Sequence, residues 1–448
     1  TINMAPADLR KEGSAYDLPL AMGILSASGQ VSTNEIEDYL IMGELSLDGS
    51  LHPIRGALPI AIKAKEEGFR GFILPMTNAE EAAIVEGLEV YGASNISEVI
   101  DHFSQRKQLS VFPSTSADDF YKKSVFPNYD YDDVKGQESV KRCMEIAAAG
   151  GHNILLIGPP GAGKTMLAKR LPSILPPMTI KEALETTKIH SVVGKLKHSG
   201  LMNQRPFRNP HHTISDVALV GGGSYPQPGE ISLSHNGVLF LDELPEFKRS
   251  VLEVMRQPLE DREVTISRAK FTITYPCSFM LVASMNPSPS GYFNDQDAPR
   301  RSTAAEMQRY LGRLSGPLLD RIDIHIEVTP VPFEKLSDHR KGEPSAEIRS
   351  RVTRARALQT LRFHQSENIH HNAQMNSRQI REFCQLDDAS LRLIKRAMDR
   401  LQLSARAYDR ILKVARTIAD LATSEHLKEH HIAEAIQYRS LDREGWLG

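Results

Sequence analysis

A glycine-rich stretch of eight residues has the composition and spacing of a phosphate-binding loop. It reads Gly158-Pro159-Pro160-Gly161-Ala162-Gly163-Lys164-Thr165, and it lies between an apolar run and a helix start at Met166. Backbone N–H groups and the positive helix end would surround phosphates, Lys164 would reach the β- and γ-phosphates, and Thr165 would bind Mg²⁺. The stretch from Gly158 to Met166 therefore predicts a nucleoside triphosphate site. The alternative is a plain turn between strand and helix.

Polar side chains end two further apolar runs. Residues 237–241 lead into Asp242 and Glu243, and residues 279–285 lead into Asn286. Ligands gather at the carboxyl ends of buried parallel strands. There Asp242 would hold Mg²⁺, Glu243 would deprotonate the attacking water, and Asn286 would hydrogen-bond the γ-phosphate or that water. Simple turns are the alternative in both places.

Arg321 stands in an otherwise apolar segment, residues 314–323. A guanidinium in such a place either forms a buried ion pair with a nearby Asp or reaches into the active site of a neighbouring subunit. The local residues leave both interpretations open.

Residues 263–268 and 271–275 alternate apolar and polar side chains, which predicts a hairpin with Arg268 and Lys270 near its tip. Two cations there suit the phosphates of a nucleic acid, and the alternative is a solvated hairpin tip. The glycine-rich residues 220–229 predict a second, flexible loop. The adjacent His211 and His212 are predicted to be structural rather than metal ligands.

Composition bounds the class of protein. At 448 residues two or three domains are expected, and the sequence contains no apolar stretch of about 18 residues that could span a membrane. Three scattered cysteines predict neither disulfides nor a metal site and fit a reducing cytoplasm. Net charge is −2, yet residues 340–420 hold 17 Lys and Arg against 9 Asp and Glu. That excess indicates either a solvated helical face or a nucleic-acid surface.

The pattern of elements predicts three domains and two linkers. We expect an α/β domain over residues 1–103, a polar linker over 104–129, an ATP-binding core over 130–330, a second linker over 331–344 and a helical domain over 345–448. Within the first domain the pattern predicts one strand over 41–47. Ser345 and Ser404 are predicted helix caps. Because the chain begins at Thr1 without Met, we expect upstream sequence.

Residues 1–103 resemble the C-terminal half of the Lon-type protease domain, which has the ribosomal-S5-like fold. The resemblance lies in residues 11–13, 43–49 and 53–56. Lon-type proteolysis needs a serine nucleophile activated by a lysine. The serine position falls near Asp17 here, and residues 58–60 replace the segment that carries the lysine. We interpret the domain as a catalytically dead protease fold that serves assembly or partner contact.

The motifs together resemble the AAA+ ATPases of the Mg-chelatase-like branch, and more closely the ComM/YifB competence family. The match is carried by residues 208–215, 228–237 and 403–408. It implies Walker A at 158–165, Walker B at Asp242 and Glu243, sensor 1 at Asn286, an arginine finger at Arg321 and a sensor 2 arginine at Arg406. The implied fold is an α/β AAA+ P-loop ATPase with an N-terminal Lon-like (S5-like) α/β domain and a C-terminal helical lid.

The chain departs from the family in one place. Many members carry two Cys-x-Cys pairs after the sensor 1 residue, whereas residues 288–290 and 300–302 contain no cysteine here. Because a structural zinc needs thiolates, we expect no metal other than Mg²⁺.

The resemblance also implies a function. It is that of a cytoplasmic, hexameric ATP- and Mg²⁺-dependent DNA helicase, which drives branch migration of recombination intermediates during natural transformation. Its partners would be branched or single-stranded DNA and recombination proteins, with no membrane. One alternative is a chelatase-type motor that remodels a protein partner, against which the Lon-like domain and the basic helical tail argue. Another is an ATP-dependent protease, which the missing Ser/Lys pair opposes.

Overall fold

The computed structural model describes residues 14–31, 35–114, 120, 129–196, 200–223, 225–268, 272–292, 302–336, 341–366 and 369–439. The chain divides into two compact units. Unit 1 combines residues 1–124 with 179–203, and unit 2 combines residues 125–178 with 204–448. The sequence pattern places residues 179–203 in the ATP-binding core, whereas the structure groups them with unit 1.

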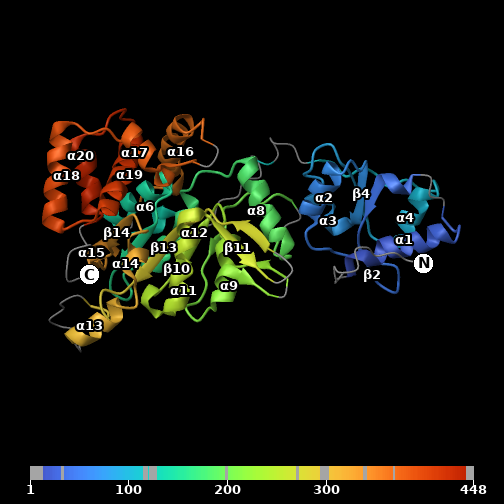
Figure 1. Ribbon diagram of the computed structural model, residues 1–448, viewed down its shortest axis with the longest axis horizontal. Helices are drawn as coiled ribbons and strands as arrows, with labels where there is room; N and C mark the ends of the chain where they lie inside the picture. The colour runs from blue at the N-terminus through green and yellow to red at the C-terminus, as the bar shows by residue number, and fades with distance from the viewer. Residues whose placement is uncertain are drawn as a thin grey trace. The chain divides into compact units, whose positions relative to one another are not determined.

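Unit 1 is an α/β unit that contains β4 (Figure 1). It is built on a parallel three-stranded sheet in the order β1-β4-β5. Every residue of β4 is buried. Its strands are β1 Tyr39–Ile41, β2 Glu44–Leu45, β3 Leu51–His52, β4 Gly71–Pro75 and β5 Glu89–Ala93. Its helices are α1 Asp17–Ala27, α2 Ala57–Glu66, α3 Met76–Ala82, α4 Ile96–Phe103 and α8 Ile180–Val192. Helix α8 packs against α2, and Gly56 N donates to Ser191 O at 3.2 Å.

The single strand expected over residues 41–47 is wrong. The structure has two strands there, β1 paired in parallel with β4 and β2 paired antiparallel with β3. Gly43 lies between them, where an added Cβ would come within 3.1 Å of Leu18 Cδ2. The chain therefore leaves one sheet at Gly43 and enters another, a change that an alternating apolar pattern does not contain.

Unit 2 contains a parallel five-stranded sheet in the order β14-β6-β13-β10-β7. Strands β6, β10 and β13 are buried throughout. The sheet strands are β6 Ile154–Ile157, β7 Phe207–Arg208, β10 Val238–Leu241, β13 Met280–Met285 and β14 Ile324–Glu327. Ile157 pairs with Met285, and Leu241 pairs with Ala283. The residues that follow these three strands consequently meet at one edge of the sheet.

Helices cover the sheet of unit 2, and a helical layer follows it in sequence (Figure 1). The helices that precede this layer are α6 Glu138–Gly150, α7 Lys164–Arg170, α9 Asp216–Val220, α10 Glu230–Leu233, α11 Arg249–Glu253, α12 Arg256–Asp261, α13 Ala304–Leu311, α14 Gly316–Leu319 and α15 Phe333–Leu336. The C-terminal layer consists of α16 Ser345–Arg362, α17 Ser377–Phe383, α18 Asp388–Leu401, α19 Ala405–Leu421 and α20 Glu429–Gln437. The predicted α/β fold class with a C-terminal helical domain is confirmed.

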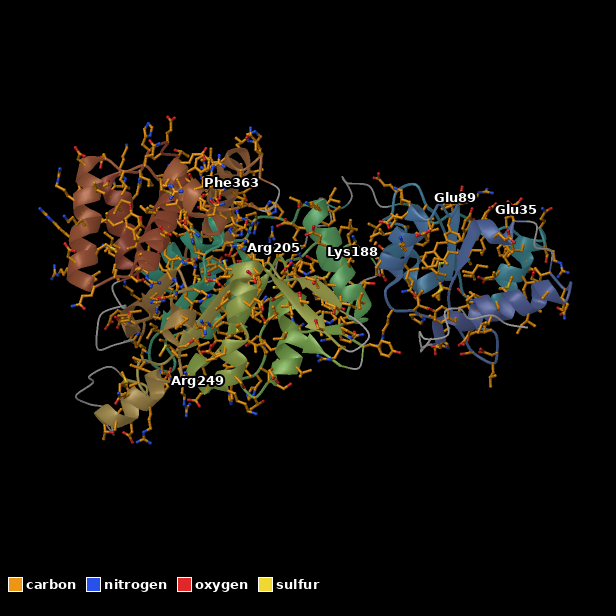
Figure 2. All side chains as sticks on the ribbon, viewed as in Figure 1. Glu35, Glu89, Lys188, Arg205, Arg249 and Phe363 are labelled. Carbon is orange, nitrogen blue, oxygen red and sulfur yellow. The ribbon has the colours of Figure 1, made fainter. Side chains whose placement is uncertain are left out.

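Side chains of the C-terminal layer share a core with the sheet, which fixes the layer against it. One apolar cluster joins Val140 of α6 and Ile154 of β6 to Ile411 of α19. Phe363, labelled in Figure 2, belongs to this cluster. Its ring packs edge to face against that of Phe383, with the ring centroids 5.8 Å apart. The apolar residues on one face of the sheet thus form a continuous core with those of the C-terminal layer, whereas the other face of the sheet belongs to a separate apolar cluster.

The two predicted helix caps have different outcomes. Ser404 caps α19 by accepting a hydrogen bond from Ala407 N at 3.2 Å, as expected. Ser345 is instead the first residue of α16, after Pro344 at the cap position. Its hydroxyl accepts from Tyr131 N at 2.9 Å, so a tertiary contact takes the place of the local one.

Two hairpins lie between β7 and β13 in sequence. Strands β11 Glu263–Ser267 and β12 Thr272–Pro276 pair antiparallel, as the alternation predicts, with Thr265 opposite Thr274. Strands β8 Gly221–Gly222 and β9 Gln227–Pro228 form a shorter pair within the glycine-rich stretch. Tyr275 Oη of the longer hairpin donates to Pro226 O at 2.8 Å, so the two hairpins touch.

Of the helices in the described ranges, none is both long and apolar enough to cross a bilayer.

Candidate active site

The glycine-rich loop joins β6 to α7 at the edge of the sheet. Gly161 and Gly163 have φ values of 77° and 91°, which L side chains rarely adopt. At Gly158 an added Cβ would lie 2.1 Å from Val328 O, so the backbone of the loop approaches its neighbour too closely for any side chain. The loop therefore needs its glycines, and its backbone is open beside Gly161, where no atom lies within 4 Å of an ideal Cβ.

Lys164 uses three hydrogen bonds to lie across this loop. Its Nζ donates to Gly158 O at 2.6 Å, to Pro159 O at 2.9 Å and to Asn286 Oδ1 at 3.0 Å. Burial lowers the pKa of Lys164, while the negative charges of Asp242 and Glu243 act in the opposite direction. The ammonium is thus held between the loop and the end of β13.

Thr165 and Asp242 meet where α7 begins and β10 ends. Thr165 Oγ1 donates to Asp242 Oδ2 at 2.8 Å, and Ser284 of β13 donates to the other carboxylate oxygen. Hydroxyl and carboxylate oxygens are the ligands that Mg²⁺ prefers, and Mg²⁺ commonly takes only one or two of them from the protein. The two side chains fit a magnesium site, with Ser284 orienting the carboxylate.

Glu243 has an unusual backbone and an exposed carboxylate. Its φ is 55°, in the left-handed region where non-glycine residues are uncommon. Its N–H lies 3.2 Å from Asp242 Oδ1 and 3.3 Å from Ser284 Oγ. Its Oε2 lies 3.8 Å from Nδ1 of His212. The conformation turns the two consecutive acids to different partners.

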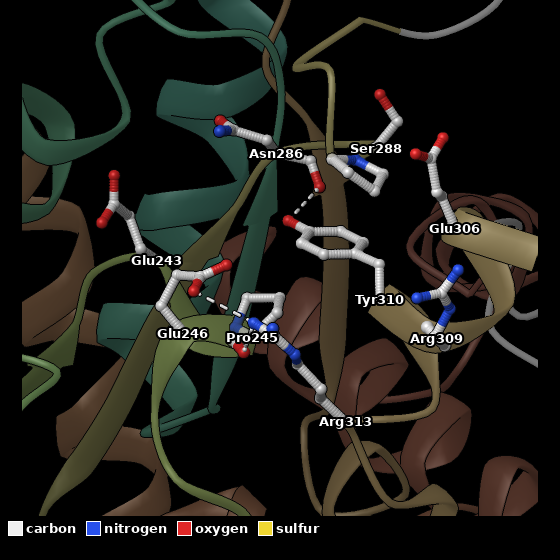
Figure 3. Close-up of a pocket in the computed structure, with 10 residues that line it drawn as sticks. Glu243, Pro245, Glu246, Asn286, Ser288, Glu306, Arg309, Tyr310 and Arg313 are labelled. Atoms are coloured by element: carbon white, nitrogen blue, oxygen red, sulfur yellow. Dashed lines mark hydrogen bonds and ion pairs between the residues drawn. The ribbon is translucent and has the colours of Figure 1, made fainter. Parts of the chain in front are cut away.

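A cavity of about 470 Å³ opens beside Glu243 and Asn286, which both line it (Figure 3). Tyr310 Oη donates to Asn286 O at 3.0 Å, which ties the end of β13 to α13. In another part of the cavity wall, Arg313 Nη1 donates to Pro245 O and to Glu246 Oε2, each at 3.0 Å. The cavity is large enough for small polar ligands and lies next to the proposed catalytic carboxylate.

Arg321 and Arg406 are held by other groups. Arg321 pairs with Glu260 at 2.6 Å rather than with an Asp, and it is largely buried. Arg406 contacts Asp320 at 3.4 Å and is 67% exposed. The structure therefore brings the two arginines to one segment, residues 320–321, while Lys164, Thr165, Asp242, Glu243 and Asn286 gather at the sheet edge.

The hairpin cations are only partly described. Arg268 is exposed, and its Nε donates to Gly223 O of the shorter hairpin at 3.2 Å. Lys270 lies outside the described residues, so its position stays a prediction. His211 bonds Thr213 at 2.9 Å, and among the residues with described positions no group of three or more His, Cys, Asp or Glu could hold a metal.

Sequence reasoning missed three residues around the site. Ser284 is the one polar residue within the buried β13 before Asn286, and this break in an apolar run could have revealed it. The sequence predicts only a structural role for His212, and the structure places its Nδ1 3.8 Å from Glu243 Oε2. Tyr310 reaches Asn286 from a helix 24 residues later, and no local pattern indicates that contact.

Three family models together match most of the chain. The model of magnesium chelatase subunit ChlI matches residues 130–336, that of the ChlI C-terminal region matches residues 342–439, and that described as subunit ChlI of Mg-chelatase matches residues 1–78. Together with the parallel sheet and the loop geometry, they define a Mg-chelatase-like AAA+ protein.

Curated relatives narrow the class. Competence protein ComM of Haemophilus influenzae is 44% identical over 99% of this chain and 86% of its own length. YifB of Escherichia coli is 45% identical over 99% of this chain and 85% of its own length. The chain belongs to the ComM/YifB family of Mg-chelatase-like AAA+ proteins.

More distant relatives match parts of the chain. DNA replication licensing factor mcm7 of Schizosaccharomyces pombe is 24% identical over 48% of this chain and 26% of its own length. Lon protease 2 of Bacillus subtilis is 26% identical over 38% of this chain and 32% of its own length. The similarity to a Lon protease agrees with the Lon-like part of the expected fold.

Proposed function

We propose that this chain is an ATP-hydrolysing ring motor that moves on DNA and drives branch migration of recombination intermediates during natural transformation. The observation that carries the ATPase part is the meeting of Lys164, Thr165, Asp242, Glu243 and Asn286 at one sheet edge. The DNA part rests on the family, whose Haemophilus member is named a competence protein, and on the cationic hairpin.

The residues at the sheet edge divide the chemistry among them. Lys164 would exchange its carbonyl partners for the β- and γ-phosphates, since a phosphate oxygen carries more charge than a carbonyl. Thr165 and Asp242 would hold Mg²⁺, which when bound neutralises charge on the phosphates. Glu243 would take a proton from the attacking water, and Asn286 would orient that water or the γ-phosphate.

Arginines would complete each site from a neighbouring subunit. Arg321 and Arg406 bond to groups other than those at the sheet edge, and a homo-hexameric ring with heterologous interfaces would bring them to the next subunit's nucleotide. ATP hydrolysis between subunits would then move the Arg268 and Lys270 hairpins along DNA. We also propose that the first domain ends at residue 103, that the ATP-binding core spans residues 130–330 and that the helical domain begins at residue 345. The proposed setting of the protein is the cytoplasm.

The decisive experiment is ATP-dependent conversion of a synthetic Holliday junction into flayed duplexes, measured at two salt concentrations. Wild type should convert the junction, and the activity should fall steeply with salt because phosphate contacts release counterions. Lys270→Ala should lose conversion while keeping basal ATPase activity. The matched control is Lys63→Ala, which removes an exposed cation from unit 1 and should behave as wild type. A wild type that hydrolyses ATP but ignores every branched DNA would contradict the DNA part.

A second candidate is a chelatase-type motor that remodels a protein partner. The family models favour it, since all three are of magnesium chelatase subunit ChlI. ATPase activity that responds to a partner protein but not to DNA would support this candidate. DNA-stimulated ATPase activity would exclude it.

A further inference from the structure

Arg321, the proposed arginine finger, is held inside its own subunit by two contacts. Its Nη2 lies 2.6 Å from Glu260 Oε1 on α12, and its Nη1 donates to Pro317 O at 2.6 Å. The side chain is only 10% exposed. Both terminal nitrogens of the guanidinium are therefore engaged by partners of its own subunit, and binding a phosphate of another subunit would require exchanging these partners.

One nitrogen of the Arg321 guanidinium, the buried Nε, has no hydrogen-bond partner among the described residues. Burying a donor without a partner is unfavourable, so this conformation does not satisfy the guanidinium fully. Glu260 supplies its only charged partner in the described residues.

The side chain of Arg321 has room to leave, while its backbone is fixed. Arg321 and Glu260 both line a cavity of about 500 Å³, and the Glu260 side chain is 55% exposed. In contrast, Arg321 N donates to Leu318 O and Arg321 O accepts from Asn153 Nδ2, each at 3.0 Å. Rotation of the side chain alone could therefore move the guanidinium.

We propose that Glu260 is a positioning residue that retains Arg321 within its own subunit until a neighbour's nucleotide competes for it. The proposal rests on the proposed function, in which Arg321 acts in the next subunit's site. One carboxylate carries a single charge, whereas a triphosphate offers several charges and a bidentate geometry for the guanidinium. In isolated subunits the ion pair with Glu260 thus keeps Arg321 in its own subunit. In the assembled ring the ion pair breaks, and Arg321 binds the neighbour's nucleotide.

The test is ATPase activity per subunit as a function of protein concentration, at saturating ATP. Glu260→Gln removes the charge but keeps the shape, so it should raise activity about three- to tenfold at concentrations below half-saturation. At saturating concentration it should match wild type. The control Glu253→Gln removes a charge from the same cavity, where Glu253 pairs with Arg256 at 2.7 Å, and should leave the curve unchanged.

Two further variants separate retention from a general effect on the fold. In the double variant Glu260→Gln/Arg321→Ala, activity should be no higher than in Arg321→Ala alone. Glu260→Asp, which keeps the charge, should lie nearer wild type than Glu260→Gln does. Melting temperatures of all variants within a few degrees of wild type would exclude unfolding as the cause.

The outcomes distinguish the proposal from the function on which it rests. A Glu260→Gln curve at or below that of Glu253→Gln, or a rise that persists in the double variant, overturns the role of Glu260 alone. If Arg321→Ala keeps wild-type activity at saturating concentration, the finger in the proposed function fails and the role of Glu260 with it. A wild type without any ATPase activity overturns both.

Discussion

At the scale of single residues, Asp242 and Glu243 are adjacent acids with different surroundings. Asp242 is bonded by Thr165 and Ser284, whereas the Glu243 carboxylate is exposed and lies 3.8 Å from His212. The left-handed backbone of Glu243 costs about 1–3 kcal/mol, which indicates that its orientation serves a purpose. We infer that Asp242 serves to bind Mg²⁺, whereas Glu243 serves to take the proton from the attacking water.

This division predicts that Glu243→Gln binds ATP but does not turn it over. The amide keeps the shape of the side chain and cannot accept the water's proton, so kcat should fall about 100-fold or more. The control is Glu246→Gln, since Glu246 lines the same cavity but pairs with Arg313. Nucleotide binding by fluorescence and phosphate release measure the two steps. Rapid hydrolysis by Glu243→Gln would remove this residue from the catalytic role.

Lys164→Ala should abolish nucleotide binding at millimolar ATP. The variant removes the cation that three acceptors hold across the loop, and with it the charge that would meet the phosphates. Lys169→Ala, which removes an exposed cation from the same helix, is the control and should bind ATP normally. Equal affinity of the two variants for ATP would contradict the assignment of the loop.

The sequence predicts the residues of this site to the extent that their spacing is local. The glycines, Lys164 and Thr165 form one uninterrupted motif, and Asp242 and Asn286 each end an apolar run. The break at Ser284 in an apolar run marks that residue, but its bond to Asp242 depends on strand pairing. His212 and Tyr310 could not be assigned from local sequence because their contacts join segments that only folding brings together.

At the scale of elements, the segment after α14 is tied to α19 by two ion pairs. Asp320 contacts Arg406 at 3.4 Å, and Asp323 contacts Arg410 at 2.8 Å, with the two arginines one turn apart on α19. Asp323 is buried and also lies 3.3 Å from Nδ1 of His152. Burial alone would raise the pKa of Asp323, but Arg410 and His152 outweigh it and hold this pKa well below its usual range.

These two pairs predict different effects on stability. Asp323→Asn should lower the free energy of unfolding by about 3 kcal/mol, because it leaves Arg410 without its carboxylate beside a buried core. Asp320→Asn, the matched control, breaks a pair whose arginine is 67% exposed and should change stability by less than about 1 kcal/mol. Thermal unfolding of both variants measures the difference. Equal losses would show that burial does not separate the pairs.

A buried histidine in helix α20 predicts that the stability of the fold depends on pH. His431 is buried, and its Nδ1 accepts from Lys428 N at 3.1 Å, which requires the neutral ring. Burial, and then the neighbouring His430, Arg416 and Lys428, lowers the pKa of His431 to about 4, and Glu434 acts in the opposite direction. Because the unfolded value is about 6.5, the unfolded state binds more protons between these values. The contribution of His431 to the free energy of unfolding is therefore complete above pH 6.5, and it falls as the pH drops toward 4.

His431→Gln should flatten this pH dependence, since the amide can accept the same hydrogen bond without titrating. The neighbouring His430 is exposed, so His430→Gln should retain the wild-type slope. The measurement is the melting temperature at pH 7.5, 6, 5 and 4. An unchanged slope in His431→Gln would assign the pH dependence to other groups.

The elements themselves were predictable where one physical pattern governs them. Buried strands such as β6 and β13 and the alternating β11–β12 hairpin follow directly from side-chain periodicity. The division of residues 39–45 between two sheets does not, because the same alternation fits one strand or two. Ser345 shows the same limit, since a serine before a helix can cap it or bond elsewhere.

At the scale of the whole molecule, chain order and spatial grouping differ. Residues 179–203 follow the phosphate-binding loop in sequence, yet α8 packs against α2 of unit 1. Ser191 Oγ bonds to Glu81, and Met202 N donates to Thr187 Oγ1 at 3.0 Å. An isolated ATP-binding core beginning at residue 130 would therefore carry a helix without its packing partner. Experiments on the proposed assembly need both units.

The proposed ring assembly predicts that two defective variants rescue each other's ATPase activity. Arg321→Ala keeps its own loop and sheet-edge residues, so it should bind ATP but lose hydrolysis because the neighbour's site lacks its finger. Lys164→Ala binds no ATP but retains Arg321. In mixed rings, an Arg321→Ala subunit beside a Lys164→Ala subunit has an intact loop and receives an intact finger. Mixtures of the two should therefore recover part of the wild-type ATPase activity.

The shape of the titration tests whether the arginine acts between subunits. Activity should pass through a maximum near equal amounts of the two variants, since the productive pairing of neighbours is then most frequent. Mixing Arg321→Ala with the double variant Lys164→Ala/Arg321→Ala supplies no finger and should recover nothing. Activity that never exceeds the sum of the separate variants would place Arg321 outside the neighbour's site, and Arg406→Ala, tested in the same way, would then be the remaining candidate for a residue acting between subunits.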